Sequence, residues 1–158
     1  MKIRKAAVAM LFSILAAAVI AADAAPLKSP DKVKEALRVL AYVQADMASK
    51  LPNKAYNRLP HENEEFQEAA PSLLDAVAAE PAALQTQVKA KLAEAKKKAN
   101  DVAEISKSGD EARITAAVAA VQKALDPLYG LFPADVRPVP GQLGGRPGRP
   151  IGPPPELR

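Results

Sequence analysis

Apolar residues recur at intervals of three and four along the chain between residues 29 and 132. This spacing places them on one face of an α-helix, whereas a strand would need an alternation that the segment does not sustain. Alanine, leucine, valine, glutamate and lysine dominate the segment, a composition that favours helix overall. Four apolar stripes can be distinguished: Val33, Leu37, Leu40, Val43 and Met47; Phe66, Ala70, Leu73 and Val77; Leu84, Val88, Leu92, Ala95, Ala99 and Val102; and Ile114, Val118, Val121, Leu125, Leu128 and Phe132.

Capping residues predict where the outer helices begin. Ser29 precedes Pro30, and this pair suits a helix start because serine caps the first turn and proline is tolerated there. Gly109 is suited to ending the third helix. Ser108 and Glu111 have the spacing of a capping box, so we expect them to start the fourth helix.

The middle of the chain leaves two arrangements open. A second helix is expected from about His61 or Asn63, Pro71 should kink or restart it, and Pro81 should open a third. Four helices with short connections predict an all-α fold, an antiparallel up-down-up-down four-helix bundle. The alternative joins the second and third helices into one longer, kinked helix, which would give a three-helix hairpin or a dimer.

Residues 1–24 have the pattern of a cleavable secretory signal peptide. Basic residues at the start precede an uncharged, mostly apolar run from Ala6 to Ala22, and small residues occupy the −3 and −1 positions before Ala25. The run is shorter than the ~20 residues of a membrane span. The sequence therefore predicts cleavage after Ala24, export to the periplasm or the extracellular space, and no stable membrane anchor afterwards. The alternative is an N-terminal anchor that stays uncleaved.

The mature chain is expected to contain two parts. Residues 25–132 form the helical domain, and residues 133–158 form a tail with eight prolines and five glycines. Such a composition cannot bury a core and favours disorder with polyproline II character. The chain's net charge of +4 arises from its two ends, since residues 25–132 are neutral overall. This distribution argues against nucleic-acid binding.

Few residues qualify as candidate sites. The chain has no cysteine, which excludes disulfides, thiol catalysis and thiolate metal sites. Its single histidine, His61, stands one helical turn before Glu65, so the pair is a weak candidate for a metal site. The competing interpretation is a helix start with acidic residues that complement the helix dipole. Arg146 and Arg149, in the run Arg-Pro-Gly-Arg-Pro, are candidates for docking on an acidic or aromatic-lined partner, or else belong to a passive spacer.

The segment 108–132, with its Gly-Asp opening and its leucines followed by an aromatic, resembles the last helix of the cytochrome c′ and cytochrome b562 group. In the c′ members this helix ends in a Cys-x-x-Cys-His haem attachment. Here Leu125 and Leu128 stand at the cysteine positions and Tyr129 at the histidine position. The segment 66–77 is similar to the third helix of the group. The resemblance implies a four-helix bundle that lacks the haem-binding residues.

The b562 members also imply a methionine near the start of the first helix and a histidine near the end of the fourth. This chain has Met47 near the end of the first helix and no histidine in the fourth. We therefore expect no stoichiometric haem binding and no other cofactor.

These patterns predict a non-enzymatic exported protein, since no nucleophile, base or pair of acids can be assigned by spacing. We expect it to act through protein contacts or self-association, in an accessory or chaperone-like role. The alternative is a carrier of a small ligand, haem or a metal.

Overall fold

The computed structural model describes residues 26–139, and all regular structure in that range is helical. The predicted signal peptide and residues 140–158 lie outside the described part. Four α-helices confirm the predicted all-helical fold. They are α1 (Pro30–Ser49), α2 (Leu59–Ala76), α3 (Ala82–Ser106) and α4 (Glu111–Tyr129), and a short 3-10 turn, η1 (Tyr56–Arg58), precedes α2.

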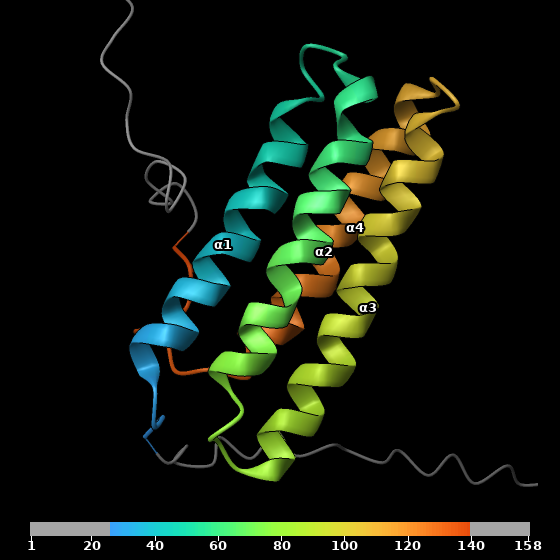
Figure 1. Ribbon diagram of the computed structural model, residues 1–158. Coiled ribbons are helices and arrows are strands. Elements are labelled where there is room, and N and C mark those ends of the chain that lie inside the picture. The colour runs from blue at the N-terminus through green and yellow to red at the C-terminus, as the bar shows by residue number, and fades with distance from the viewer. Residues whose placement is uncertain (1–25, 140–158) are drawn as a thin grey trace, which may run out of the picture.

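The four helices lie side by side and the chain reverses direction at each connection (Figure 1). α2 packs against both α1 and α3, and α3 packs against α4. α1 and α4 contact each other much less extensively. The second and third helices are separate, because α2 ends at Ala76 and α3 begins at Ala82. This break excludes the single long helix that the sequence had left open.

The predicted apolar stripes form the core. Leu37 of α1, Phe66 of α2, Leu92 of α3 and Leu125 of α4 are all buried. Leu84 is the exception and is only partly buried, because it belongs to the first turn of α3. In the described part of the chain, no helix is long and apolar enough to cross a membrane.

α1 begins at Pro30 as predicted, but a distant residue caps it. The Ser29 side chain makes no capping hydrogen bond. Instead, the carboxylate of Glu80 accepts hydrogen bonds from the backbone N–H groups of Lys28, at 2.8 Å, and Ser29, at 3.2 Å. Glu80 is 5% exposed and lies in the connection between α2 and α3. It thus ties the start of the first helix to the end of the second.

α2 begins at Leu59, earlier than predicted, because η1 leads directly into it and Pro60 occupies its first turn. Pro71 neither ends nor restarts the helix, which continues to Ala76. Proline lacks the N–H that would bond to the preceding turn. Because Pro71 is exposed, its ring projects toward solvent and does not disturb the buried face.

α4 is capped one position away from the predicted capping box. Gly109 adopts φ +69°, which glycine tolerates and which ends the run of α3. Asp110 then becomes the N-cap, and its carboxylate accepts a hydrogen bond of 3.0 Å from the N–H of Arg113. Ser108 instead accepts a hydrogen bond from the Asp110 N–H. The predicted pairing of Ser108 with Glu111 is therefore wrong.

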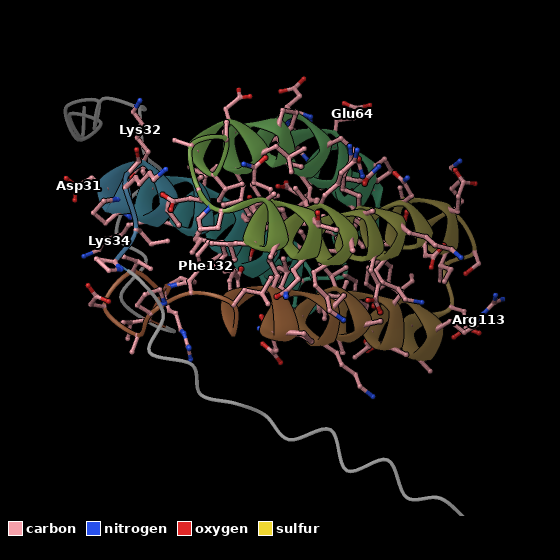
Figure 2. All side chains as sticks on the ribbon, turned by 90° about the horizontal axis from the view of Figure 1, so that it is seen from below. Asp31, Lys32, Lys34, Glu64, Arg113 and Phe132 are labelled. Atoms are coloured by element: carbon pink, nitrogen blue, oxygen red, sulfur yellow. The ribbon has the colours of Figure 1, made fainter. Side chains whose placement is uncertain are left out.

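The chain continues to pack after α4 ends. Phe132 is buried, and in Figure 2 it lies where the end of α4 approaches α1. Val136 is also buried, and the Arg137 side chain donates a 2.7 Å hydrogen bond to the carbonyl of Phe132. The sequence prediction begins the tail at Pro133, whereas Val136 still packs into the core of the helical domain. The remaining predicted tail, 140–158, lies outside the described residues.

Candidate functional site

A groove runs between the first half of α1 and the last turns of α2. Its volume is about 560 Å³. Small side chains create it, because Ala36, Ser72 and Ala76 leave space where larger residues would fill the gap between the two helices. We call it the α1–α2 groove. Its lining consists of Asp31, Lys32, Glu35, Ala36, Val39, Ser72, Asp75 and Ala76.

The edge of the α1–α2 groove is acidic. Asp31, Glu35 and Asp75 contribute three carboxylates against the single ammonium of Lys32. Among residues 26–139, neither Asp31 nor Asp75 forms an ion pair, and both are exposed. Glu35 lies 3.8 Å from the guanidinium of Arg38, an exposed pair that contributes little to stability. The groove therefore presents negative charge beside an apolar base of Ala36, Val39 and Ala76.

A second hollow, of about 470 Å³, lies on another side of α1 and has the opposite charge. It is lined by Lys34 and Arg38 of α1 and by residues 134–139. Arg137 adds a third positive group, and Asp135 is the one acidic residue of the lining. The last described part of the chain thus lies against α1, close in sequence to the α1 residues of the α1–α2 groove.

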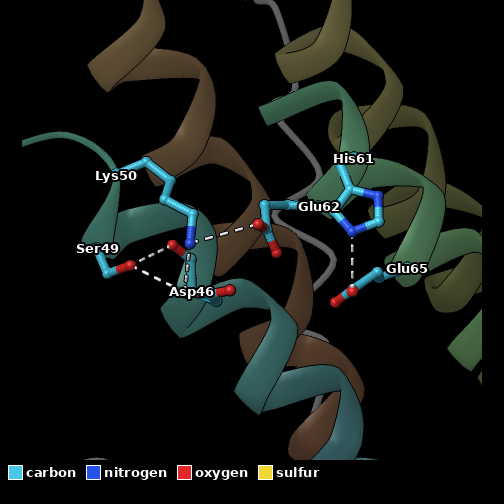
Figure 3. Close-up of polar contacts among 6 residues, drawn as sticks. All are labelled: Asp46, Ser49, Lys50, His61, Glu62 and Glu65. Atoms are coloured by element: carbon cyan, nitrogen blue, oxygen red, sulfur yellow. Dashed lines mark hydrogen bonds and ion pairs between the residues drawn. The ribbon is translucent and has the colours of Figure 1, made fainter. Parts of the chain in front are cut away.

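A cluster of charged side chains occupies the opposite half of the α1–α2 interface (Figure 3). The Lys50 ammonium donates a 2.8 Å hydrogen bond to Asp46 Oδ1 and lies 3.4 Å from Glu62 Oε1. Ser49 donates a further hydrogen bond of 3.0 Å to Asp46. The Glu62 side chain is only 6% exposed, and its Oε2 has no hydrogen-bond partner in the described part of the chain.

The environment shifts the pKa values of the two carboxyl groups of this cluster in opposite directions. Burial raises the pKa of Glu62, and the hydrogen bond and negative charge of Asp46 raise it further, against the opposing effect of Lys50. Burial would also raise the pKa of Asp46, but the hydrogen bonds from Lys50, Glu62 and Ser49 together lower it. The hydrogen bond to Asp46 raises the pKa of Lys50. The lysine therefore acts as the counterion of two carboxyl groups, the buried one of Glu62 and the partly exposed one of Asp46.

The predicted metal-site residues do lie together. His61 Nε2 is 3.3 Å from Glu65 Oε1, and His61 Nδ1 is 3.6 Å from Glu64 Oε2. No set of three histidine or acidic side chains in residues 26–139 could hold a metal ion. His61 is 63% exposed at the start of α2. This geometry favours the interpretation of His61 as an exposed side chain that pairs with the largely buried Glu65 at a helix start.

The position that the family resemblance assigns to a haem ligand is packed among apolar residues. Leu125 and Leu128 are fully buried, and the Tyr129 hydroxyl is buried without a hydrogen-bond partner among the described residues. Burial raises the pKa of Tyr129 well above its usual range, and the nearby Asp126 contributes to the same effect. A tyrosinate ligand would have to form against this shift. The environment of Tyr129 therefore disfavours haem ligation.

Sequence reasoning found neither the α1–α2 groove nor the Lys50 cluster. Asp31 and Glu35 are one helical turn apart, which is a visible signal, but the contribution of Asp75 depends on how α2 packs against α1. The predicted partner-binding residues Arg146 and Arg149 lie outside the described residues. No protein family, no curated protein and no solved structure was found to match this chain. Kinship with the cytochromes c′ and b562 remains a prediction.

Proposed function

We propose that this protein is an exported, non-enzymatic four-helix bundle of the up-down-up-down type that acts through protein contacts. Its binding surface is the α1–α2 groove. The observation that carries the proposal is the combination of an apolar base with exposed carboxylates, of which Asp31 and Asp75 have no counterion among the described residues.

The groove suits an extended, positively charged polypeptide segment. Acidic residues of both helices line the groove, so arginine or lysine side chains of a bound segment can pair with both sides. Such charge-assisted hydrogen bonds are stronger than neutral ones. The small side chains of Ala36 and Ala76 would let the backbone or a proline ring approach closely. Both kinds of contact favour a peptide partner over an enclosed small ligand.

The observations on Tyr129 support this choice over the haem carrier. A carrier of the cytochrome type would hold its ligand among the helices near the end of α4. That region is filled by Leu125, Leu128 and Phe132, all buried. The α1–α2 groove lies elsewhere on the molecule.

The test is the binding of a basic peptide, Arg-Pro-Gly-Arg-Pro-amide with a fluorescent label on its N-terminus, to the mature full-length chain. The chain carries Arg146→Gln and Arg149→Gln, so that its own basic residues do not compete. We expect saturable binding that weakens about tenfold when Asp31→Asn and Asp75→Asn are added, because each exposed carboxylate supplies a charge-assisted hydrogen bond. Fluorescence anisotropy measures the dissociation constant.

The matched control is Glu68→Gln with Glu94→Gln in the same background. Both residues are exposed, and neither lines the α1–α2 groove. Their replacement removes the same formal charge, so it should leave binding unchanged apart from a small effect of net charge, which salt screens. Equal weakening in both pairs of variants, or no saturable binding at all, would refute the groove as the binding surface.

A further inference from the structure

We propose that the occupant of the α1–α2 groove is the protein's own C-terminal segment, with Arg146 and Arg149 placed against its acidic edge. This inference rests on the proposed function of the groove. It names the partner as a segment of the same chain, residues 140–158, which follow directly on the last described residue.

The first argument is the point at which the chain leaves the domain. Residues 134–139 lie against Lys34 and Arg38 of α1, and Asp31 and Glu35 of the groove belong to the same turns of that helix. A helix with its side chains is about 10–12 Å wide. Arg146 follows Val139 by seven residues, which span about 20 Å in a polyproline II conformation at 3.1 Å per residue. The segment is therefore long enough to pass around α1 into the groove.

The second argument is spacing. Arg146 and Arg149 are three residues apart in the run Arg-Pro-Gly-Arg-Pro. A polyproline II helix has three residues per turn, so both guanidinium groups project from the same side, about 9 Å apart along the axis. Asp31 and Glu35 are one turn apart on α1, and Asp75 faces them from α2. Two arginines on one side of an extended segment can thus meet carboxylates on both edges of the groove.

The third argument is the direction in which charge would guide the segment. Residues 140–158 contain three arginines and one glutamate. On the side where the chain leaves the domain, Lys34 and Arg38 repel such a segment. Around α1, the α1–α2 groove carries three carboxylates and one ammonium and attracts it. Glu35 of the groove lies 3.8 Å from Arg38 of the second hollow, so the two surfaces adjoin along α1. The attraction therefore acts within about a Debye length at physiological salt.

A groove filled by its own chain would be masked rather than freely available. An added basic segment would bind only by displacing Arg146 and Arg149. The affinity of the native chain for a basic peptide then equals the affinity of the Arg146→Gln, Arg149→Gln variant multiplied by the fraction of native molecules in which the groove is open.

The absence of cysteine makes this proposal testable by cross-linking the full mature chain. One cysteine is introduced in the groove, Ser72→Cys, and a second in the tail, Gly148→Cys. The control replaces the groove position by Ala83→Cys, an exposed residue at the start of α3 near the same end of the molecule and outside the groove lining (Figure 1). Intact mass spectrometry under mild oxidation follows the rate of intramolecular disulfide formation.

An undocked tail, held only by its covalent connection, already gives both pairs a millimolar effective concentration. Docking therefore predicts that the groove pair closes only about tenfold faster than the control pair. Adding Arg146→Gln and Arg149→Gln should remove the difference. Equal rates for the two pairs would overturn the docking of the tail, and a cross-linked dimer that grows with protein concentration would overturn docking within one molecule. If the added peptide still binds the groove in either case, the proposed function stands and only the identity of the occupant fails.

Discussion

The two halves of the α1–α2 interface both contain acidic residues, but they use them differently. In one half, Asp46 and Glu62 are packed around Lys50, and the side chain of Glu62 is almost completely buried. In the other half, Asp31 and Asp75 are exposed, with no ion pair in the described part of the chain. A buried carboxylate requires a counterion or a proton, because desolvation of an unpaired charge is costly. An exposed carboxylate has no such requirement and remains available to a partner. The same residue types thus serve the fold at one end and, in the function we propose, recognition at the other.

The largest expected effect is on the buried half. Lys50→Met keeps the length of the side chain but removes the charge that Asp46 and Glu62 share. We expect the free energy of unfolding to fall by about 2–3 kcal/mol, less than for a fully buried pair, because the Lys50 side chain is 21% exposed. Urea unfolding followed by circular dichroism measures the change.

Lys32→Met is the matched control on the same helix. Lys32 is exposed and lines the α1–α2 groove, where it forms no ion pair with the described residues. Its replacement should change stability by less than about 0.5 kcal/mol. Similar losses for both lysines would mean that the two halves of the interface do not differ in the way we describe.

A second prediction concerns the pH dependence of the buried half. The pKa of Glu62 is raised in the folded protein, so its contribution to stability is complete below its unfolded value and is lost as pH rises through the folded pKa. Glutamine cannot titrate. The stability of Glu62→Gln relative to the native chain should therefore increase between about pH 4 and about pH 7. Asp46, whose pKa is lowered, works in the opposite direction and is present in both proteins.

Urea titrations of the two proteins at both pH values test this prediction, with Glu68→Gln on the exposed face of α2 as the control. The sign of the change decides the outcome. A decrease in the relative stability of Glu62→Gln with rising pH would show that pairing with Lys50 outweighs burial and the repulsion from Asp46.

The smallest expected effect is on the exposed half. Asp31→Asn with Asp75→Asn removes two charges that have no counterion among the described residues, so unfolding stability should change by less than about 0.5 kcal/mol. The same double variant is expected to weaken peptide binding. A loss of stability comparable to that of Lys50→Met would instead assign these carboxylates a structural role.

Most of the fold could be predicted from the sequence, because each helix has an apolar stripe of its own. The stripes through Leu37 and Leu125 became the buried faces of α1 and α4. The errors lie at helix ends, where a distant residue or a single dihedral angle determines how the helix is capped. Glu80 caps α1 from beyond α2, and no local pattern announces such a contact. The proline-rich composition predicted a tail from Pro133, yet Val136 is buried in the core.

The candidate site was less predictable than the fold. Ala36 and Ser72 are unremarkable small residues until two helices bring them together and leave a groove between them. The sequence instead drew attention to His61, since a single histidine beside acidic residues is an obvious metal candidate. What distinguishes a site here is a combination of packing and unpaired charge across two helices, and neither property is encoded within one helix.

The packing of Phe132 and Val136 also has a consequence for the order in which parts of the chain can fold during synthesis. Synthesis begins at the N-terminus, so α1 exists long before these two residues do. α1 can pack against α2 early, but its contact with residues 134–139 forms only when the end of the domain has been made. Until then, apolar surface that Phe132 and Val136 will cover stays exposed to holdase chaperones and proteases. A chain cut short before Phe132 would keep that apolar surface permanently exposed. The quality-control machinery of the cell could then recognise the truncated chain by this surface.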